Sequence, residues 1–286
     1  MASITETAKK LCEISQKAYL NPYTYINWRD EMPKEQWFMT PELISIFGTS
    51  EYEALNESQR QILSFYEATN FFSLNIHGEK SLVEGIAHRL YSKELKEFAA
   101  YLHHFLDEEN KHMIYFGGFC QRYAGKVYRN RKMEIPREYA KGEEDFLFFA
   151  RIMIFEELVD VYNIRMSTDE KLEPIARQIN LVHHLEEARH LVFGRLIVEH
   201  LFEKYSPGWS AQVLQNCKSY LSNYIVSTWK EYYNPDVYAD AGIADPYDMV
   251  EKAWNCESAR KHRAKVSSKV VEFLKERKMI DEEPAL

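Results

Sequence analysis

Residues 183–194 read HHLEEARHLVFG, and the first eight of them hold three histidines and two glutamates. In an α-helix, residues three or four positions apart lie on the same face, so His183, Glu187 and His190 would project together. Glu186 and His184 would point elsewhere. A charged, solvated helix face would also explain a single Glu-x-x-His motif. The rest of the chain therefore has to distinguish a metal site from a polar surface.

The composition is that of a globular protein without a nucleic-acid surface. Hydrophobic residues make up 45% of the chain and charged residues 28%, the net charge is −8, and no basic block occurs. The four cysteines form no Cys-x-x-Cys pair, and no segment approaches the roughly 18 uninterrupted apolar residues of a membrane span. We therefore expect a cytoplasmic enzyme with neither a nucleic-acid nor a membrane partner.

Helical periodicity predicts an all-α fold, because alternating strand patterns and hairpin turns are almost absent. Four long helices are expected over residues 56–90, 93–123, 143–166 and 175–205, and two more over residues 209–233 and 246–278. We expect one domain over residues 1–286, with a four-helix bundle core over residues 56–205. The N-terminal segment and the C-terminal helices would pack on this core.

A second Glu-x-x-His motif lies on the second expected helix, at Glu109 and His112. A di-iron carboxylate bundle takes a glutamate from each of two helices and a Glu-x-x-His motif from each of the other two, all facing inward. The repeated motif therefore predicts one inward glutamate on the first helix and one on the third.

Two glutamates on the first helix compete for this role. Glu79 shares its helix face with apolar side chains, whereas Glu84 shares its face with polar ones. A buried carboxylate is costly unless it is neutralised, and binding a cation is one of the few stable solutions. We therefore predict that Glu79 is the ligand.

On the third helix, Glu156 and Glu157 both lie in apolar surroundings, so helical periodicity leaves both open. The sequence intervals favour Glu156. This residue precedes Glu187 by 31 positions, which is close to the 30 positions between Glu79 and Glu109.

Carboxylate and imidazole ligands without thiolates suit iron or manganese. An acidic residue precedes each motif, Glu108 in one and Glu186 in the other. Each could accept the second ring N–H of a metal-bound histidine, although glutamate is also common on helix surfaces. His183 lies one turn before Glu187 and would be either an additional nitrogen ligand or a hydrogen-bonded core residue.

These motifs resemble those of the p-aminobenzoate N-oxygenase (AurF-like) family of di-iron, ferritin-like oxygenases. The resemblance depends on Glu108-Glu109-x-x-His112 and on the H-x-x-E-E-x-x-H string at 183–190, with its extra histidine. It also includes FEELVD at 155–160, which indicates Glu156 as the third-helix ligand. Further similarity in NESQRQIL (56–63) and DAGI (240–243) extends it over most of the chain from residue 40 onwards.

The resemblance implies a ferritin-like four-helix bundle core with additional C-terminal helices and a cluster of two iron ions, with manganese as an alternative metal. The cluster would be held by residues from all four long helices. One iron would be bound by Glu79, Glu109 and His112, and the other by Glu156, His183, Glu187 and His190.

The resemblance also implies that O2 oxygenates the nitrogen of a small amine, stepwise to hydroxylamine, nitroso or nitro products of secondary metabolism. The amine would be an arylamine, an amino acid or a carrier-bound amine, and the enzyme could be a homodimer. Because the sequence has no GxGxxG motif and no four-cysteine iron–sulfur motif, an external electron donor is expected. Side chains one turn from the ligands would line the substrate pocket, although rings at such positions also pack cores. These are Phe72, Asn75, Phe105, Met113 and Ile152.

Three other functions remain open. The same cluster could hydroxylate or desaturate C–H bonds, or the protein could oxidise and store iron as ferritins do. A storage protein would be shorter and would assemble into cages, so the two expected C-terminal helices argue against it. A helical interaction module with charged faces would bind less than one metal ion per chain.

Overall fold

The computed structural model describes residues 3–130 and 137–286. Within these ranges every regular element is a helix, apart from an isolated bridge between Trp37 and Leu172. The expected all-α fold is confirmed. None of the described helices is both long and apolar enough to cross a membrane.

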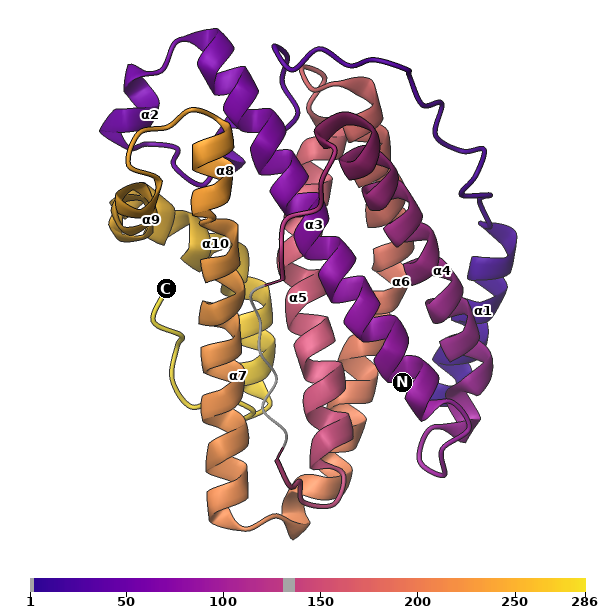
Figure 1. Cartoon of the computed structure of the whole chain (residues 1–286). Helices are drawn as coiled ribbons and strands as arrows, with labels where there is room; N and C mark the ends of the chain where they lie inside the picture. The colour runs from indigo at the N-terminus through magenta and orange to yellow at the C-terminus, as the bar shows by residue number, and fades with distance from the viewer. Residues whose placement is uncertain (1–2, 131–136) are drawn as a thin grey trace.

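Four long helices form the bundle: α3 (Glu57–Arg89), α4 (Ala99–Phe119), α5 (Glu143–Thr168) and α6 (Pro174–Tyr205). The most extensive contacts join α3 to α4 and α5 to α6, and each of these pairs runs side by side in Figure 1. The bounds agree with the expected ones, except that α4 begins later, after a 3₁₀ turn at Lys96–Phe98, and ends in a π turn at Cys120–Ala124.

Local sequence determines where these helices begin. The Asn56 side chain accepts a hydrogen bond from the Gln59 backbone N–H, and the Gln59 side chain accepts one from the Asn56 N–H, which forms a capping box at the start of α3. The Glu173 carboxylate accepts from two backbone N–H groups at the start of α6. Gly142, with φ of 76°, allows the chain to turn into α5.

Aromatic rings fill the space between the helices. The Phe72 ring of α3 stacks on Phe116 of α4 with 5.3 Å between ring centroids, and Phe119 packs edge-on against Phe72 at 5.0 Å. Phe105 stacks on the imidazole of His190 at 4.0 Å. The rings close the bundle around polar residues at its centre and exclude water from them.

Further helices cover the bundle on two sides (Figure 1). α1 (Ile4–Lys17), which the sequence analysis did not predict, packs on α4 and α6, and α7 (Ala211–Tyr232) and α10 (Glu257–Glu276) pack on α5. The remaining short elements are α2 (Ser50–Ala54), α8 (Pro235–Asp240), α9 (Pro246–Asn255) and the 3₁₀ turns Pro41–Leu43 and Ser206–Gly208.

The single helix expected over residues 246–278 was wrong, because the chain breaks between α9 and α10 at Cys256. Cys256 has extended backbone angles, with φ of −64° and ψ of 137°. The break frees the carbonyl of Trp254, which accepts a hydrogen bond from the guanidinium of buried Arg263 at 2.8 Å. The same guanidinium lies 3.9 Å from the Trp254 ring centroid. The contacts of Arg263 with Trp254 thus stabilise the end of α9 and compete with its continuation into α10.

Candidate metal centre

One glutamate from each helix of the bundle lies at its centre. Glu79 on α3, Glu109 on α4, Glu156 on α5 and Glu187 on α6 are each at most 1% exposed. Ligand atoms of Glu79, Glu109 and Glu156 lie within 4.8 Å of one another. The four carboxylates therefore converge on one small region, as the two motifs and the glutamate intervals predicted.

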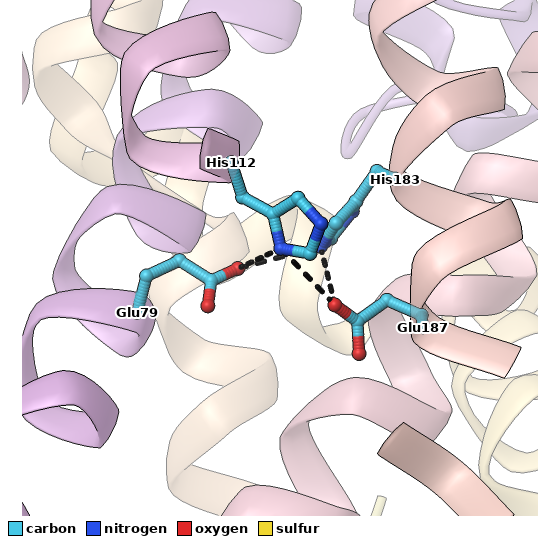
Figure 2. Close-up of side chains that lie close together, drawn as sticks. All are labelled: Glu79, His112, His183 and Glu187. Carbon is cyan, nitrogen blue, oxygen red and sulfur yellow. Dashed lines mark ion pairs between the residues drawn. The ribbon is translucent and has the colours of Figure 1, made fainter. Parts of the chain in front are cut away.

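Three imidazoles complete this cluster. His112 Nδ1 lies 3.3 Å from Glu109 Oε2 and 3.2 Å from Glu187 Oε1. His190 Nδ1 lies 2.8 Å from Glu109 Oε1 and 3.1 Å from Glu187 Oε1. His183 presents its other nitrogen, Nε2, at 3.2 Å from Glu187 Oε1. Figure 2 shows the rings of His112 and His183 between the carboxylates of Glu79 and Glu187.

The cluster has more acceptor atoms than its own hydrogen bonds use. Both carboxylate oxygens of Glu79 and of Glu156 are buried and make no hydrogen bond, and the same holds for Oε2 of Glu187. Burial raises the pKa of Glu156 well above its usual range, and the charges of Glu187 and Glu109 add to this effect. Orphaned oxygens and excess negative charge in a dry interior are the conditions that a bound cation relieves. The residues present therefore fit a metal centre.

The outer nitrogens of His112 and His190 each bond to a carboxylate on the opposite motif. His112 Nε2 lies 3.0 Å from Glu186 Oε2, and His190 Nε2 lies 2.8 Å from Glu108 Oε2. The antiparallel course of α4 and α6 explains this crossed arrangement, because residue 108 then lies opposite residue 190, and residue 112 opposite residue 186. Each carboxylate fixes the ring so that Nδ1 faces the cluster.

Two buried cations hold these outer carboxylates in turn. Lys111 Nζ lies 2.8 Å from Glu186 Oε1, and Arg189 Nη2 lies 2.6 Å from Glu108 Oε1. Burial alone would raise the pKa of Glu108, but His190 and Arg189 more than offset it and lower the pKa to about 2. Glu108 is therefore a carboxylate at neutral pH, ready to accept the imidazole N–H.

His183 lies at a different end of the cluster from the one that the resemblance implied. Its Nε2 is 3.3 Å from Glu79 Oε1, and its ring centroid is 4.5 Å from that of His112. The expected partition placed it with Glu156 and His190 instead. The helix geometry explains the difference: residues 183 and 190 lie on opposite sides of Glu187 along α6, and the end at 183 faces His112 because α4 runs antiparallel.

The competing glutamates have other surroundings. Glu84 is exposed on α3. Glu157 forms an ion pair with Arg195 of α6, whereas Glu156 points into the cluster. The structure therefore brings Glu79 and Glu156 to the centre and leaves Glu84 and Glu157 outside it.

A cavity of about 490 Å³ leads from the surface to Glu156, and its described lining residues come mainly from α3, α5 and α7. Ile152 is the only one of the five expected pocket residues among them. Phe72 and Phe105 are instead core residues that stack on Phe116 and on the His190 ring. Asn75 donates to the Phe71 carbonyl, and Met113 does not line the cavity. Proximity to a ligand in the sequence did not predict where the side chain points, because Phe72, Phe105 and Asn75 are directed to packed or hydrogen-bonded neighbours.

Gly78 lines the same cavity next to Glu79 and allows α5 to approach α3 closely. A Cβ atom at this position would lie 2.6 Å from Cε1 of Phe155, so a larger residue would displace that ring from the cavity wall.

Three residues around the cluster were missed by the sequence analysis: Lys111, Arg189 and Asn163. Lys111 and Arg189 each precede a motif histidine by one position, and this repeated placement was a signal available in the sequence. Asn163 follows Glu156 by seven positions, two helical turns along the same face, and its side chain meets His183.

Solved structures with a similar fold include variants of the R2-like ligand-binding oxidase. One single-residue variant, with an anaerobically reconstituted Mn/Fe cofactor, aligns with a TM-score of 0.52 at 15% identity and covers 96% of this chain and 93% of that chain. A second variant, with an aerobically reconstituted Mn/Fe cofactor, also aligns with a TM-score of 0.52 at 15% identity and covers 96% and 94%. This likeness confirms the ferritin-like helical fold.

Curated proteins with a similar sequence include two from mycobacteria. Uncharacterized protein Rv0885 of Mycobacterium tuberculosis (strain H37Rv) and uncharacterized protein Mb0909 of Mycobacterium bovis are each 24% identical over 207 residues. The match covers 68% of this chain and 60% of each relative's length.

The family model described as p-aminobenzoate N-oxygenase AurF matches residues 2–278. This match agrees with the helical bundle and with the buried carboxylate–imidazole cluster at its centre. The chain belongs to the p-aminobenzoate N-oxygenase AurF family.

Proposed function

We propose that the protein is an O2-dependent di-iron oxygenase that oxygenates the nitrogen of a small amine. The observation that carries the proposal is the convergence of four buried glutamates and three histidines, with orphaned carboxylate oxygens, in a chain matched by the N-oxygenase family model. The donor set contains oxygen and nitrogen atoms and no thiolate, which suits iron, with manganese as the alternative.

The arrangement favours distinct roles for the seven side chains. Glu109 and Glu187 each lie within 3.3 Å of both His112 and His190, so they would help to hold the ions from the middle of the cluster. Glu79 and Glu156 would be the ligands from α3 and α5. His183 would add a nitrogen at the end of the cluster near Glu79. Iron held in this way would supply the electrons that activate O2.

The protein around the cluster would exclude water and admit the amine. The cavity that ends at Glu156 gives a path from the surface to the cluster. In the reaction, one oxygen atom of O2 forms the new N–O bond, and the other leaves as water with two electrons and two protons. A separate reductase or small redox protein would return two electrons to the iron after each such reaction.

The test is anaerobic reconstitution with Fe²⁺ followed by O2 in the presence of p-aminobenzoate, other arylamines and amino acids. We expect hydroxylamine, nitroso or nitro products together with O2 consumption. Oxygenation of carbon alone would replace this proposal with the hydroxylase or desaturase alternative. Iron oxidation that no organic substrate influences, with assembly into cages, would favour iron storage.

A further inference from the structure

The third histidine of the cluster is held differently from the other two. His112 and His190 direct Nδ1 to the cluster and bond to a glutamate through Nε2. His183 has the reverse orientation, with Nε2 toward Glu79 and Glu187 and Nδ1 toward α5. Its Nδ1 lies 2.7 Å from Nδ2 of the Asn163 side-chain amide, whose nitrogen and oxygen are interchanged by a half-turn about the last side-chain bond.

This contact is fully buried. Asn163 is 0% exposed and His183 is 1% exposed, so water does not compete for either side chain. The edge-on contact between the His183 and Phe116 rings, at 4.9 Å and 89°, restricts the ring plane but cannot determine which nitrogen carries the proton. The position of the proton depends on the polar partners of the two nitrogens, which are Asn163 at Nδ1 and the carboxylates of Glu79 and Glu187 at Nε2.

The two orientations of the Asn163 amide have opposite consequences. If Nδ2 faces Nδ1, the imidazole accepts, its proton sits on Nε2, and Nε2 has no lone pair for a cation. That orientation also leaves Asn163 Oδ1 buried without a hydrogen bond, and Nε2 of His183 lacks one as well. If Oδ1 faces Nδ1, the imidazole donates through Nδ1–H, and the Nε2 lone pair points between Glu79 and Glu187.

We propose that Asn163 is the positioning residue for His183: its Oδ1 accepts the Nδ1 proton and fixes the tautomer whose Nε2 lone pair faces the cluster. This inference rests on the metal centre proposed above. A neutral amide strengthens an imidazole donor less than a carboxylate does. His183 is therefore the weakest of the three nitrogen ligands, and its binding depends on α5 rather than on the crossed pairs between α4 and α6.

The test is Co²⁺ binding to the otherwise metal-free protein, followed by visible absorption, which reports the number and type of ligands. We expect Asn163→Ala to weaken one of two Co²⁺ sites by about 10- to 100-fold and to change the spectrum as His183→Ala does. Asn163→Asp, which keeps an acceptor oxygen, should retain both sites. In the His183→Ala background, Asn163→Ala should have no further effect.

The matched control is Asp160→Ala. Asp160 lies one turn before Asn163 on α5 and bonds to His184 Nδ1, outside the cluster. We expect this variant to bind Co²⁺ as the unsubstituted protein does. An equal loss of Co²⁺ affinity on Asn163→Ala with and without His183 would overturn the positioning role.

A second measurement uses the unsubstituted protein, so its result does not depend on whether a variant folds. ¹⁵N NMR of the Zn²⁺-loaded protein should show His183 protonated at Nδ1 and metal-bound at Nε2, and a proton on Nε2 would overturn the proposal. If the unsubstituted protein bound fewer than two Co²⁺ ions, the proposed metal centre itself would fail. Two bound ions with no effect of Asn163→Ala would reject only the role of Asn163.

Discussion

Helix α3 buries two glutamates in two different ways. Glu67 is 3% exposed, and its carboxyl group accepts hydrogen bonds from the backbone N–H and the hydroxyl of Ser45, whose oxygen also lies 2.7 Å from the Tyr238 hydroxyl. Burial raises the pKa of Glu67 to about 8, although the Ser45 hydrogen bonds act in the opposite direction. Protonation and hydrogen bonds therefore satisfy Glu67 without a cation.

Glu79, three turns further along the helix, has no such partners. Its two oxygens make no hydrogen bond, and its polar neighbours are His183 at 3.3 Å, His112 at 3.8 Å and the other glutamates of the cluster. The comparison shows that burial of a carboxylate does not by itself indicate a metal site. Orphaned oxygens that face imidazole nitrogens do.

The largest effect is expected for Glu79→Ala. The variant should lose at least one of two iron ions per chain and all O2-dependent turnover, because a proposed ligand is removed. Elemental analysis and O2 consumption measure this. The control is Glu57→Ala, at an exposed position in the first turn of the same helix, away from the cavity. Full metal content in Glu79→Ala would mean that the two buried glutamates of α3 do not differ as described.

Glu67→Gln should change the pH dependence of stability and leave metal content intact. Because the folded-state pKa of about 8 exceeds the ordinary value of 4.5, the native protein holds a proton that the unfolded chain releases. The contribution of Glu67 to the free energy of unfolding should therefore fall between pH 4.5 and pH 8, by up to about 1.4 kcal/mol per pH unit. In the variant this contribution is absent.

Urea unfolding at several pH values measures the difference between Glu67→Gln and the unsubstituted protein, which should grow as the pH rises. The matched control is Glu57→Gln, an exposed position in the first turn of α3. A difference that stays constant from about pH 5 to pH 8 would contradict a protonated Glu67.

Glu186→Gln should weaken metal binding without abolishing it. The amide keeps the shape of the side chain but loses the charge that binds His112 Nε2 and Lys111. We expect a decrease of about 10- to 100-fold in affinity for Fe²⁺ under anaerobic conditions. Glu203→Gln, exposed on the same helix, is the control. Unchanged affinity in Glu186→Gln would show that the crossed pairs do not support the ligands.

The smallest effect is expected for Glu157→Gln. Its ion pair partner Arg195 is 40% exposed, so solvent screens the interaction, and the loss of stability should be within about 1 kcal/mol. Metal content should not change. Loss of a metal ion in this variant, measured by elemental analysis, would exchange the roles assigned to Glu156 and Glu157.

The helices and the converging residues could be predicted from the sequence because they depend on helical period. The faces of α3 distinguished Glu79 from Glu84, and the repeated Glu-x-x-His motif indicated the facing helices. The helical period did not distinguish Glu156 from Glu157, since both are buried. Their partners on other helices separate them, because Glu156 meets Glu79 and Glu109 whereas Glu157 pairs with Arg195.

Features that depend on register between helices could not be predicted. The crossing of Glu108 to His190 and of Glu186 to His112 requires the antiparallel alignment of α4 and α6, which no local pattern encodes. The placement of His183 beside His112 has the same origin. Four of the five expected pocket residues lie outside the described cavity for a related reason, because side-chain direction depends on neighbours from other helices.

The central claim is that the four glutamates and three histidines hold two metal ions. Anomalous diffraction at the iron edge, from crystals of protein loaded with Fe²⁺ under anaerobic conditions, tests it most directly. We predict two peaks per chain among Glu79, Glu109, Glu156 and Glu187, each with a histidine nitrogen as a ligand. A peak elsewhere in the chain, or none between these side chains at full loading, would contradict the account.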